Sequence, residues 1–234
     1  MVKNELITKS PLRILESSSH GGVSKGNIGV IAAKKGVGKT ACLVHIATDQ
    51  LLQDKHVIHI SFAGKTEHII CWYEDIFSEI SKRRHLESAM DVHDAIIKNR
   101  IIMNFVQNSI SVEEVIARVR SIIKDGRYNV DYIVVDGYDF YEGSREEVML
   151  IKEFAKQEGI VFWFSASLAA DIDFSSGKKI PSVLTEYLDL LEIVIVLKPE
   201  KKVIRLELVK DHGEIKLEEL HLNLDPKVLL ITEE

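Results

Sequence analysis

The chain has 234 residues, a hydrophobic fraction of 46% and a charged fraction of 28%, which suits a globular protein of one α/β domain or two small ones with a sizeable core. The net charge of −6 argues against tight nonspecific DNA binding, because that mode needs several cations on one face to neutralise phosphates. No apolar run approaches the roughly 20 residues that span a bilayer, and the start lacks the basic and apolar regions of a secretory signal. We therefore expect no membrane span and a cytoplasmic location.

The first 20 residues are mixed in composition and end in a serine-rich stretch. We interpret residues 1–20 as a lead-in segment to a single domain over residues 21–234. Apolar periodicity and turn signals then alternate along the chain. They predict a strand over 28–32, a helix over 39–53, a strand over 56–62, a helix over 66–84 and a strand over 97–106.

The second half continues this alternation. Ser111 and Glu114 have the spacing of a capping box and open a helix that Gly126 ends. The remaining pattern predicts strands over 131–136 and 160–165, a helix over 146–157, and closing strands over 193–197, 203–210 and 214–222. Strands that alternate with helices predict a three-layer α/β fold with a mostly parallel central sheet. The short turns between the last strands predict antiparallel C-terminal strands.

The loop between the first strand and the first helix ends in Gly-Lys-Thr, as a phosphate-binding P-loop does. Backbone N–H groups of such a loop cradle phosphate oxygens, and Lys39 would reach the β- and γ-phosphates. Ala33 stands where the motif has its first glycine, so this is a variant P-loop; the alternative is a loop that binds nothing. The residues expected to contact the nucleotide are Lys34, Lys35, Gly36, Val37, Gly38, Lys39, Thr40 and Ala41.

A carboxylate ends the apolar strand over 132–135. Strand ends of parallel sheets converge on the ligand crevice, so we expect Asp136 to lie near a Mg²⁺ ion that the Thr40 hydroxyl binds. The alternative role for Asp136 is to cap the following turn, and Asp139 is a second, more distant candidate. ATP and Mg²⁺ are the expected cofactors.

Several segments around these motifs resemble the RecA-fold ATPases, in particular the KaiC-type and DnaB-type branches. They are the Gly-Gly lead-in over 21–27, the strands over 57–62 and 162–168, and the closing segment over 208–213. The resemblance implies a RecA-like P-loop NTPase fold that binds ATP and assembles into a homo-oligomer through its nucleotide face. Lys210 matches the lysine finger that in this family reaches a neighbouring subunit's nucleotide.

Three catalytic features of that family are altered in this chain. Ala63 stands where the family has a glutamate that activates water, with Glu67 four residues later as a hypothetical substitute. Ala166 and Ser167 stand where the family has a glutamine, and His212 stands where it has an arginine. Because the loss of one such group costs about 10²–10³ in rate, the resemblance implies nucleotide binding with slow or absent hydrolysis. The protein would then act through assembly or through regulation of a protein partner.

Two other interpretations stay open. Lys34 precedes Lys39 by five residues, as the signature lysine does in ParA/MinD-type ATPases, which dimerise on ATP. Lys35 replaces a glycine of that pattern, however, and those proteins place an aspartate at the end of the second strand, where this chain has Phe62 and Ala63. The other interpretation is an active DNA-dependent ATPase, which the acidic net charge disfavours.

Overall fold

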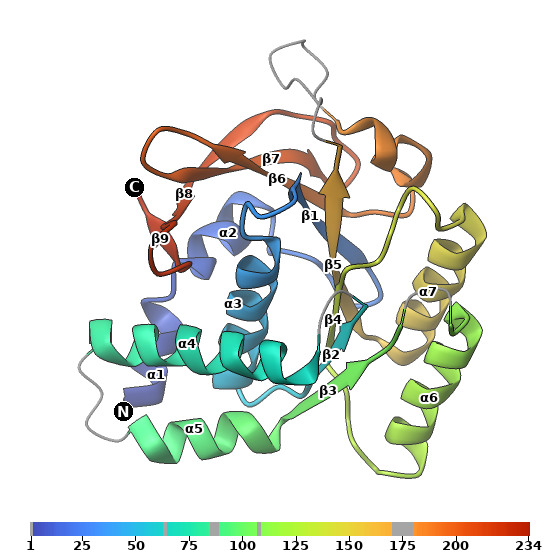
Figure 1. Cartoon of the computed structure of the whole chain (residues 1–234), viewed down its shortest axis with the longest axis horizontal. Helices are drawn as coiled ribbons and strands as arrows, with labels where there is room; N and C mark the ends of the chain where they lie inside the picture. The colour runs from blue at the N-terminus through green and yellow to red at the C-terminus, as the bar shows by residue number, and fades with distance from the viewer. Residues whose placement is uncertain (1, 63–64, 85–88, 107–108, 170–179) are drawn as a thin grey trace.

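The chain is a mixed α/β protein built on one nine-stranded sheet. The structure, a computed structural model, describes residues 2–62, 65–84, 89–106, 109–169 and 180–234 (Figure 1). The strands are β1 (Ile28–Lys34), β2 (Val57–Ser61), β3 (Arg100–Asn104), β4 (Tyr132–Asp136), β5 (Val161–Leu168), β6 (Ile193–Pro199), β7 (Ile204–Asp211), β8 (Glu218–Leu224) and β9 (Ile231–Glu233). Their order in the sheet is β3-β2-β4-β5-β1-β6-β7-β8-β9. Pairing is parallel from β3 to β6 and antiparallel from β6 to β9, which confirms the predicted sheet.

Helices cover both faces of this sheet. They are α1 (Val2–Thr8), α2 (Leu12–Ser18), α3 (Lys39–Leu52), α4 (Thr66–Arg84), α5 (Ala89–Lys98), α6 (Val112–Lys124), α7 (Arg145–Glu158) and a 3₁₀ helix, η2 (Ser182–Tyr187). Apolar residues of α1 to α5 pack in one core cluster, and those of α6, α7 and η2 pack in a second cluster. Figure 1 accordingly shows α3 and α4 on one side and α6 and α7 on the other. The arrangement is consistent with the three layers that the sequence predicts.

Local sequence signals mark the first residues of α6 and α7, the two long helices of the second core cluster. The Ser111 hydroxyl accepts from the Glu114 N–H at 3.2 Å, and the Glu114 carboxylate accepts from the Ser111 N–H at 3.0 Å, so the predicted capping box is confirmed. An equivalent box at Ser144 opens α7, which ends at Gly159 with a φ of 68°. Gly159 thus takes the left-handed conformation that commonly ends helices.

Strands β1 and β5 extend two and three residues beyond their predicted ends, to Lys34 and Leu168, and three further stretches differ more from the prediction. The strand predicted over 97–106 is confined to β3, because residues up to Lys98 belong to α5, whose Ile96 side chain is buried. Strand β8 begins at Glu218, four residues later than predicted, because the chain turns after β7, where His212 has a φ of 51°. Strand β9, which pairs with β8, lies in a stretch for which no strand was predicted.

The first 20 residues contain two short helices that pack on the rest of the molecule. Leu6, Leu12 and Leu15 are buried in the same apolar cluster as α3, and α2 lies against β8. The lead-in segment therefore contributes apolar side chains to the core on this face of the sheet.

Across the residues that the structure describes, no helix combines the length and the apolar character needed to cross a bilayer.

Candidate functional site

The predicted P-loop lies at the carboxyl end of the central strand β1. This strand is hydrogen-bonded to β5 on one side and β6 on the other, and α3 begins at Lys39 after a four-residue loop. Gly36 and Gly38 have φ values of 81° and 112°, in the left-handed region that favours glycine. The predicted sequence of strand, loop and helix is therefore present.

The departure from the motif at Ala33 has a packing explanation. The Ala33 methyl group is fully buried in the apolar cluster that α3 covers, and Ala33 pairs with Ser167 of β5. The residue therefore serves as part of β1 and its core, because the strand extends to Lys34 before the loop begins.

The N-terminus of α3 is suited to an anion. Gly38 occupies the N-cap position and has no side chain with which to cap the first N–H groups of the helix. These groups have no intrahelical acceptor, and they lie at the positive end of the helix dipole. A phosphate group is the kind of ligand that such a helix start binds.

Lys39 is folded back onto the end of β1. Its Nζ atom donates to the carbonyl oxygens of Ala33 at 3.2 Å and Lys34 at 3.3 Å, and the residue is buried. Burial lowers the pKa of Lys39; the charge of Asp136 opposes that shift, and the charge of Lys35 adds to it. The ammonium group is thus held at the loop by two carbonyl oxygens that a phosphate could replace.

Asp136 is held by one hydroxyl group on each carboxylate oxygen. Thr40 Oγ1 donates to Oδ2 at 2.8 Å, and Ser165 Oγ donates to Oδ1 at 2.7 Å. Ser165 in turn accepts from the Gly137 N–H at 2.9 Å. These contacts join the end of β4 and the second half of β5 to the start of α3.

The Thr40 and Asp136 oxygens fit the demands of Mg²⁺. The ion takes oxygen ligands at 2.0–2.1 Å in octahedral geometry, which puts adjacent ligands about 2.9 Å apart. The two oxygens are 2.8 Å apart, and Asp136 is buried beside the P-loop. A hydroxyl and a carboxylate from these two elements could therefore occupy adjacent positions on one ion.

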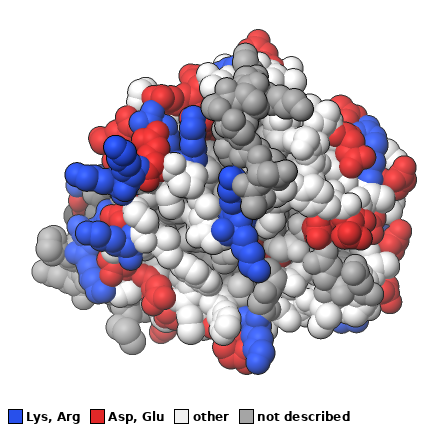
Figure 2. Space-filling view, turned by 45° about the horizontal axis from the view of Figure 1, so that its top comes forward, with Lys and Arg blue, Asp and Glu red and all other residues white. Residues whose placement is uncertain are grey.

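Charged groups on this side of the molecule are mixed. In Figure 2, which turns the top of Figure 1 forward, basic side chains lie near the centre of the face beside uncharged surface, and acidic and basic side chains are mixed at its left and right edges. Lys35 is exposed and Lys34 is half-buried. Positive charge at the P-loop suits the phosphates expected there.

The groups predicted to act on water are not gathered at this site. Ala63 lies outside the described residues. Glu67 is exposed in the first turn of α4, and within the described part of the chain no hydrogen bond or ion pair joins it to the P-loop. Asp139, the more distant candidate near the metal, accepts from the Tyr141 N–H at 2.9 Å, which caps a local turn. The participation of Glu67 stays a prediction.

Lys210 lies near the opposite end of the sheet from the P-loop. It pairs with Val194, which pairs with Val30 near the start of β1. Its Nζ atom donates to the Leu191 carbonyl at 2.7 Å and to the His212 carbonyl. The structure therefore does not bring Lys210 to the P-loop of its own chain, and its predicted action on a neighbour's nucleotide stays a prediction.

Two contacts of the site lack any local sequence signal. Ser165 reaches Asp136 only because β5 lies next to β4 in the sheet. Leu224, at the end of β8, lies so close to Gly38 that a Cβ atom added at Gly38 would overlap with its Cδ2 atom. Knowledge of the strand order in the sheet would have identified Ser165 as a neighbour of Asp136.

Comparison with models of known protein families found no match, and comparison with curated proteins found none either, so the residues of the site carry the functional argument.

Proposed function

We propose that this chain binds ATP with Mg²⁺ as a RecA-like, KaiC/DnaB-like P-loop protein, and that it hydrolyses the nucleotide slowly or not at all. The observation that carries this proposal is the contact between Thr40 Oγ1 and Asp136 Oδ2, 2.8 Å apart at the start of α3. That contact joins the two motifs whose combination distinguishes a nucleotide site from an ordinary glycine-containing loop.

Each group has a distinct role in this proposal. The N–H groups of residues 35–41 bind phosphate oxygens, and Lys39 leaves the carbonyls of Ala33 and Lys34 to bind the β- and γ-phosphates. Thr40 and Asp136 bind Mg²⁺, which would neutralise phosphate charge. Ser165 holds the second oxygen of Asp136 and so fixes the direction of the carboxylate.

Slow hydrolysis is proposed from the identity of the residues at the expected catalytic positions. Ala63 and Ala166 have no group that could orient water or contact a phosphate, and Glu67 is exposed. Positioning of water and stabilisation of charge supply most of the rate in phosphoryl transfer. A protein that binds ATP without rapid hydrolysis would act by a nucleotide-dependent change in its assembly or in its affinity for a protein partner.

The test is calorimetric titration with ATP, with and without Mg²⁺. Lys39→Ala is expected to weaken binding about 10- to 100-fold, because one charge-assisted contact to phosphate is lost. Asp136→Asn is expected to remove the gain in affinity that Mg²⁺ brings. Asp139→Asn is the matched control, since that carboxylate accepts from the Tyr141 N–H in a local turn. Unaltered binding in both site variants would reject the assignment.

Turnover and assembly separate the alternatives. A clear ATPase rate that disappears in Glu67→Ala would contradict slow hydrolysis, and stimulation by single-stranded DNA would favour a DNA-dependent ATPase. Light scattering is expected to show an ATP-dependent oligomer. A dimer that is lost in Lys34→Ala would favour the ParA/MinD-like interpretation instead.

A further inference from the structure

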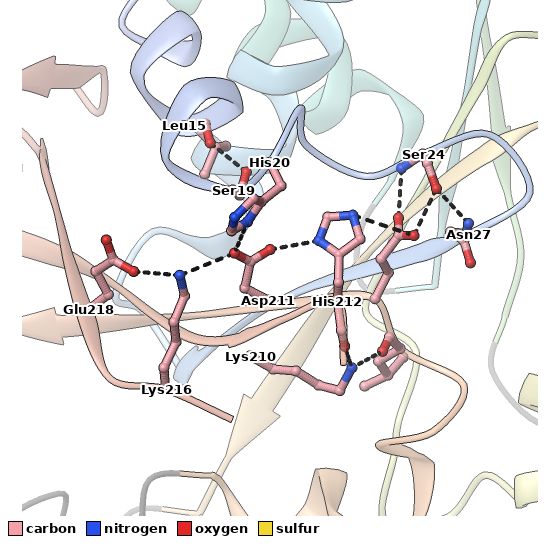
Figure 3. A network of polar contacts seen from close by, with 12 residues as sticks. Leu15, Ser19, His20, Ser24, Asn27, Lys210, Asp211, His212, Lys216 and Glu218 are labelled. Atoms are coloured by element: carbon pink, nitrogen blue, oxygen red, sulfur yellow. Dashed lines mark hydrogen bonds and ion pairs between the residues drawn. The ribbon is translucent and has the colours of Figure 1, made fainter. Parts of the chain in front are cut away.

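Two histidines face one buried aspartate near the amino end of β1. Figure 3 shows His20, from the loop after α2, and His212, which follows β7, on either side of Asp211. His20 Nδ1 lies 2.6 Å from Asp211 Oδ2, and His212 Nδ1 lies 2.7 Å from Asp211 Oδ1. One ligand atom from each of the three residues lies within 4.8 Å of the others. His20 and Asp211 are 191 residues apart in the chain.

The backbone at both histidines is unusual. His20 has a φ of 49° and His212 a φ of 51°, in the left-handed region that few residues other than glycine adopt. Such conformations persist where the surrounding structure determines them, and they cluster at functional positions. Here they accompany two imidazole rings that meet on the same carboxylate.

Asp211 is buried among nitrogen donors. Its side chain is 1% exposed. Nitrogen atoms of His20, His212 and Lys216 lie 2.6, 2.7 and 3.2 Å from its carboxylate oxygens. A buried carboxylate needs cationic or hydrogen-bonding partners, and a metal ion is one such partner.

Glu192 supports His212 from the other side of the ring. Glu192 Oε1 lies 3.7 Å from His212 Nε2. The same carboxylate accepts from the Ser24 N–H at 2.6 Å and from the Ser24 hydroxyl at 2.7 Å, so its position is fixed. Histidines that bind a metal through one ring nitrogen almost always donate from the other to a carboxylate, a carbonyl or water. If Nδ1 of His212 is the metal ligand, donation from Nε2 to Glu192 requires their 3.7 Å separation to shorten to hydrogen-bond distance.

Lys216 competes for the same carboxylate. Its Nζ atom lies 3.2 Å from Asp211 Oδ2 and 2.6 Å from Glu218 Oε2. A metal ion would take over the Asp211 oxygen, and Lys216 would keep Glu218 as its partner. The loss of this competitor should therefore strengthen metal binding.

We propose that His20, Asp211 and His212 bind a divalent transition metal such as Zn²⁺. Two imidazoles and a carboxylate suit Zn²⁺, Co²⁺ or Ni²⁺, with ligand distances of about 2.0–2.2 Å. Ligands of a tetrahedral ion stand about 3.4 Å apart. The two contacts between histidine and Asp211, at 2.6 and 2.7 Å, would each lengthen by less than about 1 Å, and the three ligand atoms already lie within 4.8 Å of one another. His20 is 73% exposed, which leaves a path for the ion and a position for water. The bound ion would tie the segment after α2 to the end of β7.

The test is calorimetric titration of the full chain with Zn²⁺, without nucleotide and after treatment with a chelator. We expect one ion per chain, and binding at least about 100-fold weaker in His20→Ala and in His212→Ala, since even a supporting partner is worth 10–100-fold. His221→Ala is the matched control: His221 is also 73% exposed, has a φ of 52° and lies 3.4 Å from Glu234. It is expected to bind Zn²⁺ as the parent chain does.

A second variant tests the proposal by a gain rather than a loss. Lys216→Ala should bind Zn²⁺ about 2- to 5-fold more tightly, because the ammonium no longer competes for Asp211. Misfolding cannot produce this gain. Two results would overturn the proposal. One is that the parent chain does not bind Zn²⁺ at micromolar concentrations, and the other is that His20→Ala and His221→Ala bind Zn²⁺ with equal affinity.

Discussion

The two ends of the parallel sheet each hold a buried aspartate between two side chains, and the partners differ in kind. At the carboxyl end, the hydroxyl groups of Thr40 and Ser165 donate to Asp136. Near the amino end, the imidazoles of His20 and His212 contact Asp211. Oxygen ligands suit Mg²⁺, whereas imidazole suits Zn²⁺ and its neighbours. One sheet can thus offer two ion sites of different selectivity, because each end gathers a different set of loops.

The largest expected effect concerns the loop at the carboxyl end. Gly38→Ala should lower the free energy of unfolding by about 2–4 kcal/mol, since the φ of 112° is strained for alanine and its Cβ atom would overlap with Leu224. Gly36→Ala is the control: its φ is 81°, but no atom lies within 4 Å of an added Cβ, so about 1 kcal/mol is expected. Urea unfolding measures both. Equal losses would show that the contact with Leu224 contributes nothing.

The next largest effect concerns the aspartate near the amino end. Asp211→Asn should cost about 1–3 kcal/mol at neutral pH, because the partners of a buried charge are left unsatisfied. The folded-state pKa of Asp211 lies below its unfolded value, so this stabilisation is present above about pH 4 and is lost as the pH falls through the folded pKa. Unfolding of both proteins across pH 2–7 should therefore show stabilities that converge in acid. A difference in the free energy of unfolding between the two proteins that stays constant from pH 2 to 7 would contradict the role given to Asp211.

A smaller effect is expected from the hydroxyl that supports Asp136. Ser165→Ala should weaken Mg²⁺-dependent ATP binding about 3- to 10-fold, in line with the loss of one hydrogen bond to a charged group. Ser167→Ala, two residues along the same strand and exposed, should leave binding unchanged. Calorimetry with both variants distinguishes a specific contact from a general weakening of β5, which would affect the two alike.

The smallest effect tests whether the two ends are independent. His20→Ala removes a proposed metal ligand near the amino end and should change the affinity for Mg²⁺ and ATP by less than about twofold, because no residue is shared between the sites. A larger change would mean that the ends are coupled through β1 and its neighbours.

The carboxyl end could be predicted from the sequence, because its signals are local. The loop before Lys39 and the strand that ends in Asp136 each lie within a few residues, and α3 begins where the motif predicts. The contact between Thr40 and Asp136 follows once the strands are parallel, since their carboxyl ends then lie together. Ser165 required the order of strands in the sheet, for which an isolated serine in an apolar strand offers no signal.

The amino end could not be predicted in the same way. His20 precedes the first strand and Asp211 ends the seventh, so only the folded chain brings them together. A second error concerns the strand predicted over 97–106, since α5 runs to Lys98 and β3 begins at Arg100. The sequence misleads here because Ile96 and Ile97, at the end of the helix, are apolar like the residues of the strand that follows. Periodicity detects elements, but contacts between distant loops depend on topology.

The contact between Leu224 and Gly38 also bears on how this chain can change in evolution. Glycine is required at position 38 for two separate reasons, the left-handed backbone and the leucine side chain that fills the adjacent space. A smaller residue at position 224 would remove the steric reason and leave the backbone reason in place. A larger residue at position 38 therefore requires both a tolerated left-handed backbone and a change at position 224, which links the loop to the C-terminal strands.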